Sequence, residues 1–310
     1  MSSGLVAGNR KPQTSAPFLL QGPILAALLP PSGSASRNGP RRPSAHKDSP
    51  IVLLNVIERL PAQPAGHPPV VFLHGLFGRA RNMGFLQRQV ARTHRTLALD
   101  LRNHGESPHG PMDYPTMVDD VVETLRAQEA LPAILVGHSM GGKLAMIMAL
   151  QYPELVAGLL IGDMAPARTG FGQAALAEAM LHIHFPDHLD RQEADQLLAR
   201  EIPNRSVRDL MLQNVRLGSD PGWQIGLQDI TNSMPNIENW PYMPEGYVYE
   251  GPTLFLRGEH SPYICKDHEP VMRRLFPHYR LETIPDAGHW LHADNPKLFT
   301  EKMLAFIDTI

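Results

Sequence analysis

Short apolar runs alternate with helix-like segments from residue 51 onward. The run at 69–75 is continuous rather than alternating, which is typical of a strand buried on both faces. Strand candidates cover 51–58, 69–75, 95–101, 133–137 and 155–163. Helix candidates between them cover 81–92, 116–129 and the segment after Ser139 to about Gln151. This alternation predicts an α/β fold in which helices cover both faces of a mainly parallel sheet.

The alternation breaks at Pro166 and resumes with a strand candidate at 252–259. The intervening stretch is mostly helical and polar, and little of it reads as buried strand. Because it is too long for an ordinary loop between two strands, it predicts a helical cap over 166–250. The sheet domain is then expected at 49–165 and 251–310, closing with a strand at 279–284 and a helix at 297–309.

The first 48 residues differ in composition from the rest of the chain. They are rich in proline, serine and basic residues and hold no acidic residue before Asp48, which predicts a disordered extension over 1–48. Acid-poor ends of this kind also resemble transit peptides, so mitochondrial import stands as an alternative to a cytoplasmic location. The single cysteine, Cys265, cannot form an intramolecular disulfide, which suits a reducing compartment.

Charge and hydropathy exclude two classes of partner. The net charge is −3 and no helix-like segment carries a basic stripe, so no nucleic-acid partner is expected. No apolar run approaches the roughly 18 residues that a membrane span needs. The expected partner is a small-molecule substrate, and the oligomeric state stays open.

The stretch "AILVGHSMGGKLAM" at 133–146 places Ser139 where a buried strand runs into a helix. A turn this sharp needs residues without side chains two positions before and two positions after the serine. Gly137 and Gly141 meet that need and form the G-x-S-x-G pattern of a nucleophile elbow. The following helix directs its N-terminal N–H groups toward the serine, which favours a developing negative charge. The structural alternative is a glycine-rich packing turn.

A serine nucleophile needs a base, which comes last along the chain in this architecture. The segment "IPDAGHWLHADNP" follows the last strand candidate and predicts His289 as the base, with His292 as its competitor. Three other histidines are close together in the sequence: His182, His184 and His188. We expect them at ordinary surface or core positions, and a metal site is the weaker alternative. We expect no metal and no cofactor.

The acid has more than one candidate position. Its usual place follows the strand that resumes after the insertion, but Ser261 stands there in "RGEHSPYI". Asp163 ends the preceding strand in "LIGDMAP", and a carboxylate there can also reach the histidine Nδ1. We therefore predict Asp163 as the acid, with Glu259 and Asp267 as alternatives. The structural alternative for Asp163 is a cap on the turn that follows it.

The oxyanion donors are expected to be backbone N–H groups. One comes from the turn in "FLHGLFG", which assigns Leu76 with Phe77 as a neighbouring candidate. The residue after the nucleophile, Met140, supplies the other. The polar loop "DLRNHGESP" at 100–108 is expected to stabilise the turn beneath the site and has no catalytic role.

Taken together, "HGLFG", "DLRNHGESPH", "GHSMGGK" and "DAGHWLHAD" resemble the α/β-hydrolase superfamily. More narrowly, they resemble the small esterase branch that contains the bacterial YbfF esterase and alpha/beta-hydrolase domain-containing protein eleven. The resemblance covers about residue 50 to 310. It implies an eight-stranded sheet with a cap after the sixth strand, and an aspartate there supported by a serine, here Asp163 and Ser261. The chain departs from this pattern in its extension and at Gly226, where related caps tend to carry a polar residue.

The resemblance implies a cofactor-free hydrolase of acyl esters and sometimes of acyl-CoA thioesters. We therefore predict a serine carboxylesterase that acts on short- to medium-chain acyl esters through an acyl-enzyme. Carbon–carbon bond hydrolases and cofactor-free haloperoxidases use the same triad and fold, so both remain alternatives. An alternative of another class is a binding protein built on a hydrolase scaffold.

Overall fold

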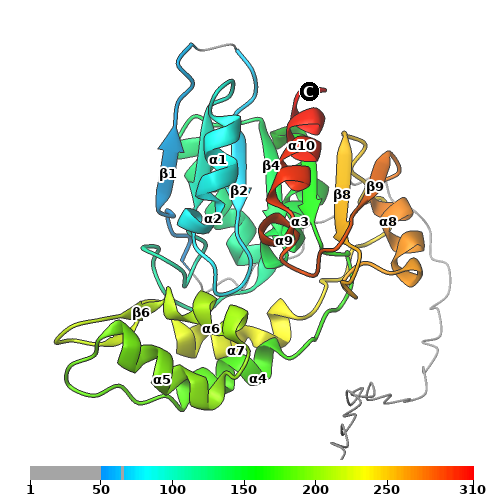
Figure 1. The fold of residues 1–310 in the computed structure, drawn as a ribbon. Coiled ribbons are helices and arrows are strands. Elements are labelled where there is room, and N and C mark those ends of the chain that lie inside the picture. Colours follow the sequence, from blue (N-terminus) through cyan, green and yellow to red (C-terminus); the bar gives the residue numbers. More distant parts are fainter. Residues whose placement is uncertain (1–49, 64–65) are drawn as a thin grey trace, which may run out of the picture. The chain divides into compact units, whose positions relative to one another are not determined.

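The computed structural model describes residues 50–63 and 66–310. The extension predicted over 1–48 lies outside the described residues. Seven strands form one sheet in the order β1-β3-β2-β4-β5-β8-β9, in which β1 runs antiparallel to β3 and every other pair is parallel (Figure 1). Their bounds are β1 Val56–Arg59, β2 Val70–Leu73, β3 Thr96–Leu99, β4 Ala133–His138, β5 Val156–Gly162, β8 Thr253–Gly258 and β9 Tyr279–Ile284.

The α/β prediction is confirmed, but the expected eight strands are wrong for the described residues, where this sheet has seven. The count of eight came from the family resemblance, whereas the seven strand candidates read from the sequence each have a counterpart in this sheet. The first of them begins at Val56 instead of residue 51. Ahead of it, the backbone N–H of Val52 donates to Asp120 Oδ1 at 2.9 Å, and that of Leu54 donates to Thr124 Oγ1 at 2.9 Å, so side chains of a helix hold this segment.

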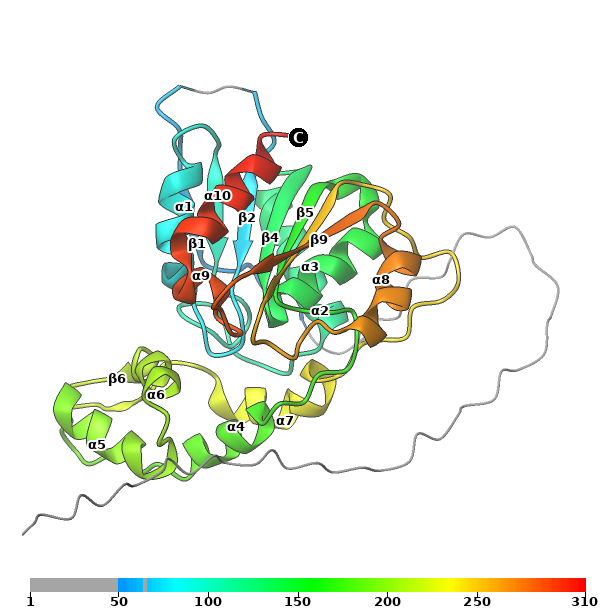
Figure 2. The same cartoon turned by 45° about the vertical axis from the view of Figure 1, so that its right-hand side comes forward.

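Two hydrophobic clusters cover the two faces of the sheet. Along β2, Val70 and Phe72 face one cluster and Val71 and Leu73 face the other, and all four are fully buried. Burying a side chain of this size contributes about 1.5–3 kcal/mol. One face packs on α1 (Gly84–Val90), α9 (Leu291–Asp294) and α10 (Pro296–Ile307), which lie together in Figure 2. The other packs on α2 (Tyr114–Ala127), α3 (Met140–Gln151) and α8 (Glu269–Leu275).

Between β5 and β8 the chain forms four helices and a short hairpin, which we call the cap segment (residues 166–250). The hairpin pairs Val215 with Trp223 and was not expected, because strands of two residues leave no periodic signal. The helices and strands of the cap segment are α4 Gln173–Leu181, α5 Arg191–Glu201, α6 Arg205–Leu212, β6 Val215–Arg216, β7 Gly222–Trp223 and α7 Leu227–Ile237. No helix in the described part of the chain combines the length and apolar character needed to cross a bilayer.

Gly226 lies where α7 begins and packs against the polar loop at 100–108. Its N–H donates to the carbonyl oxygen of Asn103 at 2.9 Å. A Cβ atom at this position would lie 2.5 Å from Asn103 Oδ1, far inside van der Waals contact. The side chains of Asn103 and His109 therefore leave no room for a Cβ atom, which explains why glycine stands here instead of a polar residue.

A buried lysine joins α3 to the end of α7. Lys143 is fully buried, and its Nζ donates to the carbonyl oxygens of Glu238 at 3.0 Å and Asn239 at 2.9 Å. These carbonyls follow the last turn of α7, where the helix dipole is negative and favours a cation. Desolvation lowers the pKa of Lys143 to about 7, although Glu238 opposes that shift. The contact thus places a titratable group between the core and the cap segment.

The lowered pKa of Lys143 predicts a pH-dependent stability. Because the unfolded chain binds this proton more tightly, the free energy of unfolding rises from pH 7 toward the ordinary lysine value of 10.5. Lys143→Met removes the titration, so the wild type should gain about 2 kcal/mol relative to this variant between pH 7 and pH 9. Urea denaturation at both pH values measures the difference. Lys297→Met, at an exposed position, is the control and should run parallel to the wild type; parallel curves for Lys143→Met would contradict the prediction.

Candidate active site

Ser139 lies at the junction of β4 and α3 with a left-handed backbone, φ 54° and ψ −119°. A Cβ atom on Gly137 would lie 2.3 Å from the carbonyl oxygen of Gly141, and one on Gly141 would lie 2.3 Å from that of Leu73. Neither position can therefore hold a side chain without moving the backbone. The Ser139 N–H donates to the Gly162 carbonyl at 3.0 Å, which fixes the turn to β5. The turn holds the half-buried serine at the carboxyl end of the sheet.

His289 lies in the loop between β9 and α9 and connects Ser139 to Asp163. Its Nδ1 is 2.7 Å from Asp163 Oδ2, and its Nε2 is 2.9 Å from Ser139 Oγ. An ionised carboxylate only accepts hydrogen bonds, so Nδ1 carries the proton and Nε2 accepts from the serine hydroxyl. The side chain of His289 is 18% exposed, whereas that of Asp163 is fully buried. The structure thus brings together the three residues that were predicted from separate parts of the sequence.

Asp163 follows β5 and is held by donors from several segments. Its Oδ1 accepts from the Gly258 N–H at 3.0 Å, and its Oδ2 accepts from the Ser261 hydroxyl as well as from His289. Its own N–H donates to the Leu256 carbonyl at 2.8 Å. A fully buried carboxylate is stable only when such donors replace water. The arrangement fits an ionised side chain that orients the imidazole.

The alternative acids lie elsewhere. Glu259 is exposed, and its Oε2 accepts from the Asp286 N–H at 3.0 Å. Asp267 is exposed in η3 (Lys266–His268). In the described part of the chain, neither carboxylate forms a hydrogen bond with His289.

The competing histidines also lie apart from Ser139. His292 in α9 contacts the ring of His138, with ring centres 4.6 Å apart, and burial lowers its pKa to about 4. No hydrogen bond joins it to Ser139 among the described residues. The three histidines of the loop between α4 and α5 are exposed: His182, His184 and His188.

The backbone around the oxyanion candidates is fixed by a buried histidine and by the cap segment. The Phe77 N–H donates to His104 Nε2 at 3.1 Å, and the Phe77 carbonyl accepts from Asn214 Nδ2 at 2.7 Å. The N–H group of Phe77 is therefore already used in a hydrogen bond and is not available to an oxyanion. The N–H groups of Leu76 and Met140 donate to no other residue in the described ranges, so they can donate to the oxygen of a bound substrate.

His104 is kept neutral by its surroundings. Burial, with the nearby ring of His74, lowers the pKa of His104 to about 3. Its Nδ1 donates to the carbonyl oxygen of Arg102 at 2.8 Å, which leaves Nε2 as an acceptor for Phe77. Asp100 adds a second support from the same loop, because its Oδ1 accepts from the Ala80 N–H at 2.7 Å. The loop at 100–108 thus holds the turn that carries Leu76.

Sequence reasoning missed four residues that contact the site. His138 Nε2 donates to the backbone oxygen of His289 at 2.8 Å, and the ring of Tyr263 stacks on that of His289. Asn214 and His104 hold Phe77 as described above. The two histidines lie inside quoted motifs and could have been found there. Tyr263 lies in the quoted stretch "RGEHSPYI", but nothing in that stretch shows that its ring meets His289. Asn214 lies in no quoted stretch, so only its position in space reveals it.

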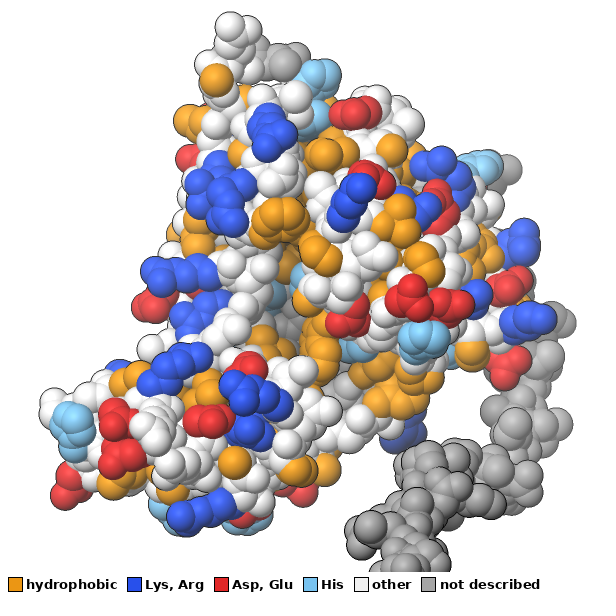
Figure 3. Space-filling view, viewed as in Figure 1, with side chains coloured by type: hydrophobic (Ala, Val, Ile, Leu, Met, Phe, Trp, Pro, Cys, Tyr) orange, Lys and Arg blue, Asp and Glu red, His pale blue; other side chains and the backbone are white. Residues whose placement is uncertain are grey.

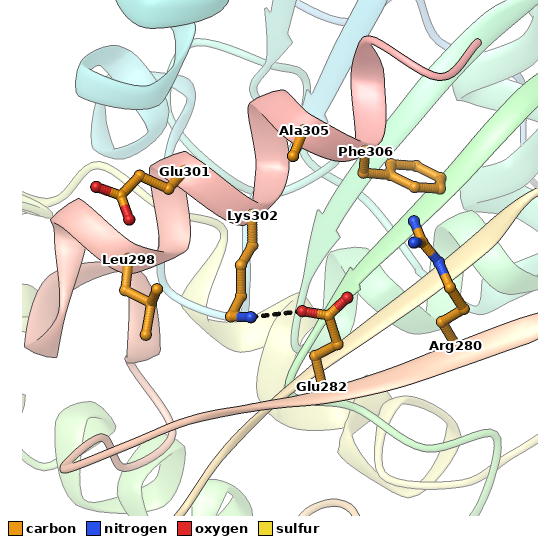
Figure 4. A pocket seen from close by; sticks show the side chains of 7 residues that line it. All are labelled: Arg280, Glu282, Leu298, Glu301, Lys302, Ala305 and Phe306. Atoms are coloured by element: carbon orange, nitrogen blue, oxygen red, sulfur yellow. Dashed lines mark hydrogen bonds and ion pairs between the residues drawn. The ribbon is translucent and has the colours of Figure 1, made fainter.

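Two surface pockets in the described part of the chain lie away from this group. Figure 4 shows one of about 340 Å³ between β9 and α10, lined by Arg280, Glu282, Leu298, Glu301, Lys302, Ala305 and Phe306. Another, of about 590 Å³, is lined by Lys266, Glu269, Pro270, Arg273 and Arg274. In the space-filling view, hydrophobic side chains border a recess between the core and the cap segment, with histidine side chains beside it (Figure 3). The two charged pockets include none of the predicted site residues.

One group of side chains within the described ranges has the composition of a metal site. Ligand atoms of Glu259, His260 and Asp286 lie within 4.8 Å of one another, and all three residues are exposed. The Asp286 N–H already donates to the Glu259 carboxylate. Because exposed acidic groups gather without any ion, we assign this group no role.

Comparison with known proteins agrees with the geometry. Residues 68–296 match the family described as alpha/beta hydrolase fold. The chain belongs to this family. It is 38% identical to the sn-1-specific diacylglycerol lipase ABHD11 of Mus musculus, covering 77% of this chain and 81% of that one. It is 31% identical to esterase YbfF of Escherichia coli, covering 78% and 94%. These relatives make it an esterase- or lipase-type member of the family.

Solved structures support the same fold. A marine microorganism esterase superimposes with a TM-score of 0.77 at 31% identity, covering 82% of this chain and 99% of that one. E-2-(acetamidomethylene)succinate hydrolase superimposes with a TM-score of 0.67 at 21% identity, covering 83% and 96%, and so shares the fold alone.

The contacts of Asp163 predict a specific pattern of mutational effects. Asp163→Asn should lower kcat for p-nitrophenyl butyrate by about 10²–10⁴-fold, because an amide neither fixes the tautomer nor stabilises the imidazolium. Ser261→Ala should cost less, since the Gly258 donor remains. Glu259→Gln and Asp267→Asn are the controls and should stay near the wild type. The prediction would be wrong if Asp163→Asn were nearly normal and either control variant, shown to be folded by circular dichroism, had a severe defect. The acid would then lie in the loop that contains Glu259 and Asp267.

Proposed function

We propose that this chain is a serine carboxylesterase that hydrolyses short- to medium-chain acyl esters through an acyl-enzyme on Ser139. The observation that carries the proposal is the continuous chain of hydrogen bonds from Ser139 Oγ through both nitrogens of His289 to Asp163, at 2.9 Å and 2.7 Å. This arrangement lets a serine lose its proton as it attacks a carbonyl carbon.

In the acylation step, Ser139 Oγ attacks the ester carbonyl carbon while His289 Nε2 takes the hydroxyl proton. The carbonyl oxygen becomes an oxyanion and accepts from the N–H groups of Leu76 and Met140. The bond to the leaving oxygen then breaks, and His289 returns the proton to the departing alcohol. In the second step a water molecule gives a proton to His289 and attacks the acyl-enzyme, and Ser139 recovers its proton as the acid leaves.

Neighbouring histidines support this use of His289 because they stay neutral. The ring of His138 lies 5.0 Å from that of His289 and 4.6 Å from that of His292. Burial holds the pKa of His138 well below its usual value and lowers that of His292 to about 4. No second imidazolium therefore opposes the positive charge that His289 gains during the reaction.

The choice of esters over other bonds rests on the relatives. Relatives that are 38% and 41% identical are named diacylglycerol lipases, and one that is 31% identical is named an esterase, whereas another that is 31% identical is named ethanol acetyltransferase 1. The carbon–carbon bond hydrolase among the structural neighbours, a meta-cleavage product hydrolase, is only 19% identical and supports the fold alone. An acyl-CoA thioester needs the same attack on a carbonyl carbon, so it is a second substrate class to test. We also propose the division into a core at 49–165 and 251–310 and a cap at 166–250. The four helices and the hairpin that lie between β5 and β8, none of which joins the main sheet, support this division.

Replacing the nucleophile tests the proposal directly. Ser139→Ala should lower kcat on p-nitrophenyl acetate and butyrate by several orders of magnitude, because no other group can form the acyl-enzyme. Ser206→Ala, at an exposed position in α6, is the matched control and should leave turnover unchanged. Near-wild-type activity in Ser139→Ala would show that the mechanism is wrong.

A substrate panel tests the bond that is cleaved. We expect kcat/KM to be highest on an oxygen ester within a set of p-nitrophenyl esters of increasing acyl length, a diacylglycerol, an acyl-CoA and a dienone. Product analysis by mass spectrometry identifies the bond. Preference for the dienone over every ester would replace the esterase with a carbon–carbon bond hydrolase.

A further inference from the structure

The phenol ring of Tyr263 covers one face of the His289 imidazole. The two ring centres are 3.7 Å apart and the ring planes differ by 13°, so the rings are stacked. Tyr263 is 5% exposed and lies between β8 and η3, two residues after Ser261. Its N–H donates to Ser261 Oγ at 3.3 Å. The loop that supplies Ser261 to Asp163 therefore also supplies the ring that lies against His289.

The cap segment holds Tyr263 from its other end. Gln173, the first residue of α4, donates through Nε2 to the Tyr263 hydroxyl oxygen. The Phe171 N–H donates to Gln173 Oε1 at 3.0 Å, and the ring of Phe171 lies 4.5 Å from that of Tyr263. Burial raises the pKa of Tyr263 to about 12, so the phenol is neutral. Tyr263 is thus fixed between the core and the cap segment.

Stacking adds a constraint that the two hydrogen bonds of His289 do not supply. The bonds at Nδ1 and Nε2 act in the plane of the imidazole and place no atom against either of its faces. A parallel ring in contact with one face opposes tilting of the imidazole toward that side and excludes water from that face. The negative face of an aromatic ring also attracts a cation within about 6 Å. The contact therefore favours both the reactive orientation of His289 and its protonated form.

We infer that Tyr263 is a positioning residue for His289, and that Gln173 couples the position of the cap segment to the base of the triad. The inference rests on the proposed function, because it assumes that His289 acts as the base. Tyr263 forms no hydrogen bond with Ser139 or Asp163 among the described residues and acts through the imidazole on which it stacks. The titratable groups that surround the imidazole are Asp163, His138, His292 and Tyr263, and burial keeps the last three neutral.

Two substitutions separate the ring from the hydroxyl. Tyr263→Leu removes the aromatic face and should lower kcat by about 10- to 30-fold with little change in KM, because the lost attraction acts on charged His289. Its acidic limb of kcat/KM should move to lower pH. Tyr263→Phe keeps the ring and should restore the wild-type limb, with a smaller loss of kcat than Tyr263→Leu. Tyr242→Leu, at a tyrosine of the cap segment that is 83% exposed, is the matched control and should leave both unchanged.

The coupling to the cap segment is tested by a double-mutant cycle. Gln173→Leu and Tyr263→Phe each remove the same hydrogen bond, so each should lower kcat by only about 2- to 5-fold, and the double variant should be no worse than either alone. Fully additive losses would overturn the coupling. Wild-type kcat in folded Tyr263→Leu, or equal losses in Tyr263→Leu and Tyr263→Phe, would overturn the positioning role.

A spectroscopic measurement separates failure of this inference from failure of the proposed function. A stacked phenol shifts the His289 Cε1–H proton resonance upfield, and Tyr263→Leu should remove that shift whether or not the protein hydrolyses esters. The resonance is assigned with His289→Gln. If the shift is lost in Tyr263→Leu but the wild-type protein cleaves no ester, the stacking is supported and the proposed esterase function is refuted. An unchanged resonance in Tyr263→Leu, in an active esterase, would refute the stacking.

Discussion

The fully buried carboxylate of Asp163 is the interaction around which the site is built. A charge without solvent is stable only when nearby donors take the place of water. The backbone of Gly258 and the hydroxyl of Ser261 provide those donors from the end of β8 and the loop after it, and the imidazole of His289 provides another from the loop after β9. The same charge that demands these contacts orders the loops after β8 and β9. Stability and the geometry of the proposed reaction therefore depend on one side chain.

The cap segment meets the core at elements that also carry the site. Lys143 belongs to the helix that follows Ser139 and binds the end of α7, while Asn214 holds the turn that contains Leu76. Gln173 reaches His289 through Tyr263. A displacement of the cap segment would therefore act together on α3, on the turn that carries Leu76 and on His289, the proposed base. Through these contacts the cap segment helps to position the residues of the site.

The sequence predicted those features that depend on local constraints. The glycines around Ser139 can be read directly, because each is required by a backbone contact within the elbow or with β2. The strands of the main sheet could also be predicted, because most of them are continuous apolar runs. The acid was harder to predict, since Asp163, Glu259 and Asp267 differ only in which one faces His289 after folding. The stacking of Tyr263, the hairpin of the cap segment and the pairing of residues 52 and 54 with α2 are long-range contacts that leave no local pattern.

The central claim is that Ser139 becomes covalently acylated, and trapping that bond tests it most directly. The folded protein is treated with a fluorophosphonate, digested, and mapped by tandem mass spectrometry, with His289→Ala treated in parallel. We predict a single stoichiometric adduct on the peptide containing Ser139 and much slower labelling in His289→Ala, because the serine then lacks its base. Absence of an adduct on a folded sample, or an adduct on another serine, would contradict the account and favour a binding protein on a hydrolase scaffold.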